Sequence, residues 1–224
     1  MTAIAVILTF VVFLTIDYFR SRKRVLQPAG ELKAKTVSPI PRLQPAVVAG
    51  FELPDHFRYH PGHTWALSES PTFVRVGLDS FAARLAGRIQ NIILPARGQW
   101  IRQGQKLATI FRDGSKADLV SPIEGEVTGV NEAVLKDPKL ASHDPYGEGW
   151  LLTVHSPDAK TSFRNLLGGA LARKWMEEAA SRLRMWMPAL AGAVAQDGGL
   201  AVDDLLAHLP DQEWKELTAE FFLM

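Results

Sequence analysis

The stretch that decides the fold is residues 107–127, which read LATIFRDGSKADLVSPIEGEV. Two strand-like segments meet at Asp113 and Gly114, and an Asp-Gly pair supplies the positive φ angles of a two-residue β-hairpin turn. Pro122 and Gly125 then mark a second turn, after which another strand begins. The sequence therefore predicts a hairpin with its tip at Asp113 and Gly114.

Upstream of this hairpin the chain has the composition of short strands separated by turn residues. Strands are predicted at 64–67, 72–77 and 89–94, rich in β-branched and aromatic residues. A helix is predicted at 79–87, because Asp79 can cap its first turn and Gly87 can end it. Short strands with little helix indicate a mainly β domain, an antiparallel barrel or sandwich.

The C-terminal part of the sequence is helical in pattern. Residues 170–187 have the helical period and are followed by Pro188, which is expected to end the helix. A short helix is predicted at 202–209, and another at 210–223 with an acidic first turn. The first of these helices is expected to pack against the domain, with an interfacial membrane helix as the alternative. Its packing face is expected to contain Leu171, Trp175, Ala179, Leu183 and Trp186.

The N-terminal part differs in composition from the rest. An apolar run at residues 2–19 precedes four basic residues within 20–24. A run of roughly 18 residues is at the lower limit for spanning a bilayer, and the basic cluster predicts that the following part faces the cytoplasm. We therefore expect a single-pass membrane protein, with a cleaved signal peptide as the alternative. Residues 25–56, which are rich in proline, are predicted to be a linker.

The overall composition excludes several classes of function. Hydrophobic residues make up 47% of the 224 residues, so a buried core is expected. The formal net charge of +1 argues against nucleic acid as a partner, since phosphate binding needs a concentrated basic field. The chain has no cysteine, which removes thiolate chemistry and cysteine-based metal sites. His60 and His63 alone are too few ligands for a metal site, and none is predicted.

Short motifs spread over residues 57–168 resemble the glycine cleavage H-protein family, within the biotinyl/lipoyl-domain superfamily. They occur in the order found in that family: HTW at 63–65, VGLDSFA at 76–82, LPARG at 94–98, SPIEGEV at 121–127 and DPYGEGWL at 144–151. The resemblance implies a barrel-sandwich hybrid at 57–168. The complete organisation would be an anchor at 1–24, a linker at 25–56, this domain, and a helical extension at 169–224.

The resemblance also identifies the residues that matter at the hairpin. In that family a lysine at the tip carries lipoate, and a glutamate precedes it. Counted back from Ser121, the lysine position is Gly114 and the glutamate position is Phe111. Lys116, two residues past the tip, is the nearest amine. The resemblance thus implies a variant without the lipoyl lysine, and lipoylation of Lys116 would require a shifted hairpin register.

We expect a protein that is not an enzyme and has no cofactor: a membrane-anchored interaction or scaffold subunit with a protein partner and no small-molecule substrate. The alternative is a lipoyl carrier modified at Lys116, which shuttles an intermediate between enzymes. A third hypothesis is an enzyme that uses the loop at 144–150. The residues expected to form the interaction surface are His63, Asp113, Gly114, Tyr146 and Trp150.

Overall fold

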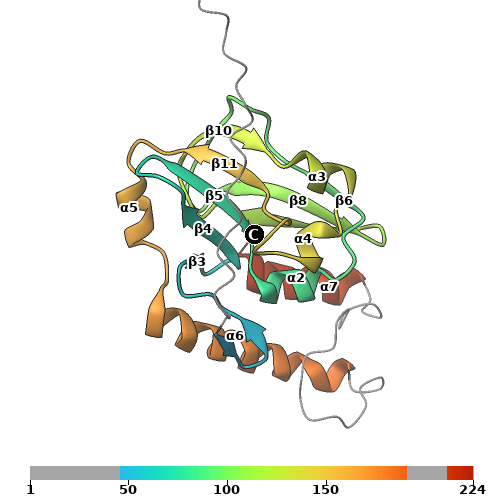
Figure 1. The fold of residues 1–224 in the computed structure, drawn as a ribbon. Helices are drawn as coiled ribbons and strands as arrows, with labels where there is room; N and C mark the ends of the chain where they lie inside the picture. Colours follow the sequence, from blue (N-terminus) through green and yellow to red (C-terminus); the bar gives the residue numbers. More distant parts are fainter. Residues whose placement is uncertain (1–45, 191–210, 224) are drawn as a thin grey trace, which may run out of the picture. The chain divides into compact units, whose positions relative to one another are not determined.

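The structure is a computed structural model that describes residues 46–190 and 211–223. Most of its strands belong to two antiparallel sheets (Figure 1). The six-stranded sheet contains, in spatial order, β3 (Arg58–His60), β4 (Thr64–Ser68), β5 (Phe73–Leu78), β11 (Leu152–His155), β10 (Gly125–Val130) and β7 (Trp100–Ile101). The three-stranded sheet contains β6 (Asn91–Ile93), β8 (Lys106–Arg112) and β9 (Ser115–Val120).

The prediction of a mainly β domain is confirmed; of the expected barrel-sandwich hybrid, the described strands form two sheets and no closed barrel. Within the described residues both sheets are open, with β3 and β7 at the ends of one and β6 and β9 at the ends of the other. The strands show the expected alternation. In β10, for example, Val127 is buried whereas Glu126 and Thr128 on either side of it are exposed.

The core between these elements is built from aromatic and aliphatic side chains. Trp65 on β4 is fully buried, and its ring lies edge-on to Phe57 at 4.8 Å between centroids. Gly77 on the neighbouring strand lies opposite Trp65, and a β-carbon there would collide with the indole ring. The close approach of β5 to Trp65 therefore requires glycine at this position.

Short helices follow the strands. They are α2 (Ser80–Ala86), α3 (Glu132–Lys136), α4 (Leu140–His143) and α5 (Ala159–Arg164). The predicted caps of α2 are confirmed: the Asp79 carboxylate accepts a hydrogen bond from the amide of Ala82 at 2.7 Å, and Gly87 ends the helix with φ +59°.

The folded region begins before residue 57, where the linker was expected to end. Strands β1 (Val47–Val48) and β2 (Phe51–Glu52) form a small hairpin. Phe51 and Leu53 are buried, and the Phe51 ring lies 4.9 Å from that of Phe81 on α2. The proline content suggested a linker, but these two apolar side chains attach the segment to the core.

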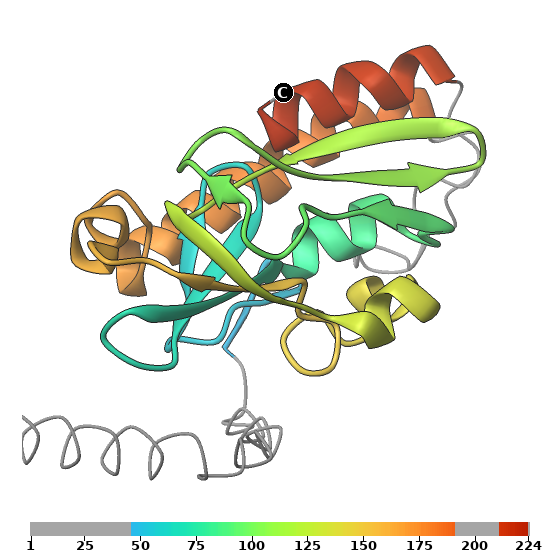
Figure 2. The same ribbon diagram turned by 90° about the horizontal axis from the view of Figure 1, so that it is seen from above.

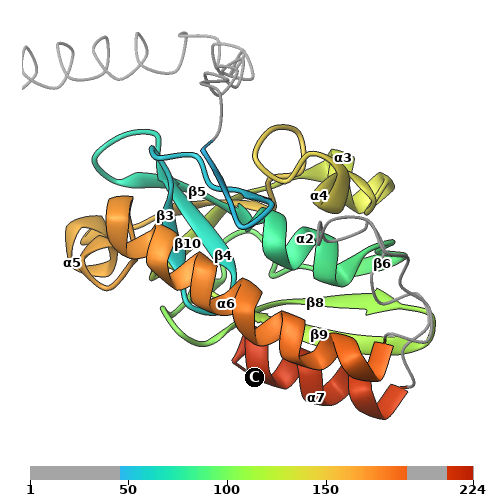
Figure 3. The same cartoon turned by 90° about the horizontal axis from the view of Figure 1, so that it is seen from below.

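Two longer helices complete the described chain, α6 (Gly169–Leu190) and α7 (Asp211–Phe222). Helix α6 packs against the domain as expected, although it continues two residues beyond Pro188, and Leu171 is exposed rather than on the packing face. Figures 2 and 3 show α7 alongside the β8–β9 hairpin and next to α6. The short helix predicted at 202–209 lies outside the described residues.

The described part of the chain contains no helix that corresponds to the predicted membrane span. Among the helices in residues 46–190 and 211–223, none is both long and apolar enough to cross a bilayer. The apolar run at 2–19 on which the prediction rested, with most of the expected linker, lies outside the described residues.

Candidate functional site

The β8–β9 hairpin has the register that the Asp-Gly pair predicts. Arg112 pairs with Ser115, which leaves Asp113 and Gly114 as a two-residue loop with φ angles of +48° and +84°. Both loop residues are exposed. Gly114 is therefore at the tip, and the two-residue shift that would bring Lys116 there is absent.

Lys116 lies on β9 opposite Phe111, and its side chain is exposed. It lies on the same face of the strand as Asp118, two residues further along. The other lysine of the hairpin is engaged, because Lys106 Nζ lies 2.7 Å from the Asp118 carboxylate. Burial alone would raise the pKa of Asp118, but hydrogen bonds from Lys106 and Thr109 outweigh it and hold that pKa below its usual value.

The hairpin tip is fixed to the C-terminal end of α2. The Gln90 amide donates to the Asp113 carboxylate at 2.7 Å, and the Asp113 backbone N–H donates to the Gln90 side-chain oxygen at 3.0 Å. Arg112, which is buried, donates to the Ala86 carbonyl at 3.2 Å. These contacts hold the tip in one orientation relative to α2, which would lower the entropic cost of binding through the tip. Neither Gln90 nor Arg112 could be identified from the sequence, because their contacts join residues more than 20 positions apart.

The N-terminal end of α2 contains a buried polar pair. His63 Nδ1 lies 2.8 Å from the second carboxylate oxygen of Asp79, and neither side chain is exposed. The His63 ring stacks on Phe81 at 4.0 Å and lies 4.6 Å from Trp175 of α6. Its Nε2 atom is buried and has no hydrogen-bond partner among the residues that the structure describes. Asp79 thus orients His63 and caps α2 at the same time.

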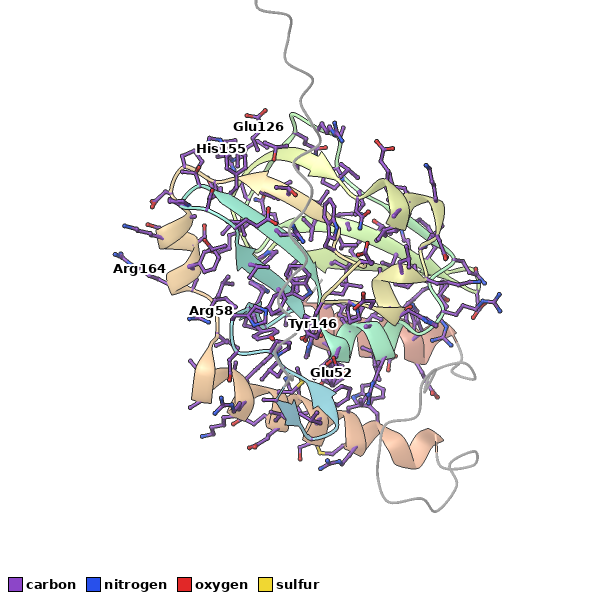
Figure 4. All side chains as sticks on the ribbon, in the orientation of Figure 1. Glu52, Arg58, Glu126, Tyr146, His155 and Arg164 are labelled. Carbon is purple, nitrogen blue, oxygen red and sulfur yellow. The ribbon has the colours of Figure 1, made fainter. Side chains whose placement is uncertain are left out.

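Tyr146 joins the loop at 144–150 to the same end of α2. Its hydroxyl donates to the Glu52 carbonyl at 2.8 Å and accepts from the Ser80 backbone N–H at 3.1 Å. Figure 4 shows Tyr146 and Glu52 close together. Burial raises the pKa of Tyr146 far above its ordinary value, so the phenol is neutral.

The structure thus places the five predicted interaction residues in different environments. Asp113 and Gly114 are exposed at the hairpin tip. His63 and Tyr146 are buried on the far end of α2, and Trp150 is half-buried with the Arg75 guanidinium 5.4 Å above its ring. The exposed tip is accessible to a partner, whereas the buried side chains of His63 and Tyr146 are not.

The C-terminal helices also reach this region. Trp214 of α7 lies under the Arg112 guanidinium at 5.6 Å, and Phe221 packs on Phe81 at 5.0 Å. Trp186 of α6 donates to the Glu220 carboxylate at 2.9 Å, which holds the two helices together. Helix α7 therefore runs along β9, from near the tip towards the base of the hairpin.

His60 and His63, which could have suggested a metal pair, each form a hydrogen bond within the domain. His60 Nδ1 accepts from the Gly62 backbone N–H at 3.0 Å, and His63 is bonded to Asp79. Burial lowers the pKa of His60, with a smaller contribution from His63. Across the described part of the chain, no group of three or more His, Asp or Glu side chains could hold a metal ion.

Comparisons with known proteins agree on one family. Residues 57–179 match the family described as "Glycine cleavage H-protein". A glycine cleavage system H protein from Prochlorococcus marinus (strain NATL2A) is 33% identical over 117 residues, which are 52% of this chain and 90% of the relative. A probable glycine cleavage system H protein from Aeropyrum pernix is 35% identical over 113 residues, 50% of this chain and 78% of the relative.

The crystal structure of a glycine cleavage system H protein from Mycobacterium marinum superposes with a TM-score of 0.49 at 27% identity, covering 56% of this chain and 98% of that one. The family match begins at residue 57, so the segment at 2–19 is not part of it. The relatives are named as H proteins, which also speaks against the membrane localisation predicted from that segment.

Proposed function

Because this chain belongs to the glycine cleavage H-protein family, we propose that it is a lipoyl-type carrier whose attachment amine is Lys116. In this proposal the protein catalyses no reaction. It holds a lipoyl group at the end of the β8–β9 hairpin and passes a bound intermediate between partner enzymes. The names of the relatives support the carrier role, since each is a glycine cleavage system H protein.

The main support within the structure is the position of Lys116. Its side chain is exposed, and it lies two residues from the loop, about 7 Å along the strand at roughly 3.3 Å per residue. Lys106 is a poorer candidate because it is at the base of the hairpin and bound to Asp118.

A second function is favoured by the tip itself. Gly114 occupies the position of the family's lysine and Phe111 that of its glutamate, and the observed register leaves Lys116 off the tip. These residues favour an interaction subunit without lipoate, which would dock on a protein partner through Asp113 and Gly114. The tethers from Gln90 and Arg112 support this reading, since they hold the tip rigid.

One experiment separates the two functions. The intact mass of the protein purified from its native cells would be measured, with peptide mapping across residues 107–127. A carrier shows one added lipoyl group on Lys116, which is lost in a Lys116→Arg variant and kept in a Lys160→Arg control. A mass equal to the bare chain contradicts the carrier proposal and favours the interaction subunit.

A lipoate ligase assay in vitro provides the positive control. Gly114→Lys restores a lysine at the tip, where a β-carbon would have no neighbour within 4 Å. The positive φ of this position costs about 1–2 kcal/mol, which a folded domain tolerates. If this variant is lipoylated and the parent chain is not, the ligase recognises the hairpin and Lys116 is not its target.

A further inference from the structure

A pocket of about 560 Å³ lies between α2 and α4. Its walls carry three permanent cations, Arg84, Arg88 and Lys139, together with the imidazole of His143. The single acid among the lining residues is Glu52. The complete chain has a formal net charge of only +1, so the positive charge of this pocket is a local feature.

Helix dipoles account for the positions of two of these basic side chains. Arg84 is in the last turn of α2 and His143 in the last turn of α4, where a positive side chain is stabilising. Arg88 follows the end of α2, and Lys139 precedes the first residue of α4.

The walls of the pocket are held in place. The Arg84 guanidinium lies 5.4 Å above the Phe51 ring, a cation–π contact that limits its freedom. The hydroxyl of Ser80 donates to the Glu52 carbonyl at 2.8 Å, and that of Ser142 donates to the Lys139 carbonyl at 3.1 Å. With both hydroxyls bonded to the backbone, the exposed side chains of Arg88 and Lys139 are the groups through which the pocket can bind a ligand.

We propose that this pocket binds a small phosphate-bearing ligand, with Arg88 and Lys139 neutralising its charge beside Arg84, and with His143 as a further donor. Arginine and lysine are the residues that phosphate oxygens prefer, through charge-assisted hydrogen bonds. The volume is within the range of small-molecule sites and exceeds that of a bare ion. This site is separate from the proposed attachment amine, and it would be present in either of the two functions above.

The pocket also adjoins the hairpin tip. Gly87 is part of its wall, and the preceding carbonyl, that of Ala86, accepts the hydrogen bond from Arg112. Asp113 is bonded to Gln90 three residues further on. A ligand in the pocket would therefore lie against the same chain segment that orients the tip.

Calorimetric titration of the full-length chain with pyrophosphate tests the proposal. The test variant is Arg88→Gln with Lys139→Gln, because both side chains are exposed and their removal leaves the core intact. The matched control is Lys160→Gln with Arg164→Gln on α5, which removes the same charge from residues that do not line the pocket. Figure 4 shows Arg164 on this helix.

We expect saturable binding that weakens about tenfold for each cation removed, hence about a hundredfold in the test variant. The control is expected to bind within about twofold of the parent chain. Succinate, as a carboxylate probe, is expected to bind more weakly than pyrophosphate. The absence of binding to the folded parent chain, equal loss in both variants, or succinate binding as tight as pyrophosphate would each overturn the proposal.

Discussion

Substitutions at Asp79 would measure how much one buried carboxylate contributes to folding. One of its oxygens caps α2 through the Ala82 amide at 2.7 Å, and the other lies 2.8 Å from His63 Nδ1. Asp79→Ala removes both contacts. Asp79→Ser keeps a capping hydroxyl, because serine is an equally good N-cap residue, but removes the bond to His63.

The magnitudes follow from the two contacts. Loss of the cap costs about 1 kcal/mol, and leaving a buried His63 nitrogen without a partner costs about 1–3 kcal/mol. The free energy of unfolding should therefore fall by about 2–4 kcal/mol in Asp79→Ala. In Asp79→Ser it should fall by about 1–3 kcal/mol, which is the contribution of the His63 contact alone.

Urea denaturation followed by tryptophan fluorescence and far-ultraviolet circular dichroism would measure these differences. Asp158→Ala is the matched control, because Asp158 is the N-cap residue of α5 but makes no side-chain capping bond there. Its effect should stay within about 0.5 kcal/mol. If Asp79→Ser is as stable as the parent chain, the His63 contact contributes nothing, and the reasoning about this pair is wrong.

Three further substitutions test other features of the site. The folded-state pKa of Asp118 is lowered, so its bond to Lys106 stabilises the fold above the ordinary carboxyl pKa of 3.8. Asp118→Asn should therefore lower the free energy of unfolding at pH 7. The difference from the parent chain should disappear as the pH falls through the folded-state pKa. His60 also has a lowered pKa, so protonation of the folded state is unfavourable. Stability should decline as the pH falls below the ordinary value of 6.5, and less so in His60→Gln, as pH-dependent melting would show. Gly125→Ala should reduce the melting temperature strongly, because φ is +156° and the new β-carbon would collide with the His155 carbonyl; unchanged melting would refute this.

Local signals predicted the parts of the fold that depend on local chemistry. The Asp-Gly pair specifies the hairpin tip because few other residues adopt two successive positive φ angles. Asp79 and Gly87 mark the ends of α2 for similar reasons, one as a side-chain acceptor and the other through its conformational freedom.

Contacts between distant residues were not predictable in this way. Whether Leu171 or Met176 faces the core depends on where α6 docks, and a helix with apolar residues on several sides leaves that choice open. Phe51 was assigned to a linker because prolines surround it, although burial against α2 outweighs that composition. The basic pocket was not predictable from the sequence, because Arg88 and Lys139 are about fifty positions apart in the chain and meet only in the folded domain.

The position of α7 has a consequence for the behaviour of the protein in concentrated solution. Strand β9 is the last strand of its sheet, and a last strand with free backbone groups is a template on which a second chain can pair and aggregate. Helix α7 runs along this strand and buries Trp214, Leu217 and Phe221 against the domain, so intermolecular strand pairing is blocked there. The helix therefore protects the chain against aggregation through its own hairpin.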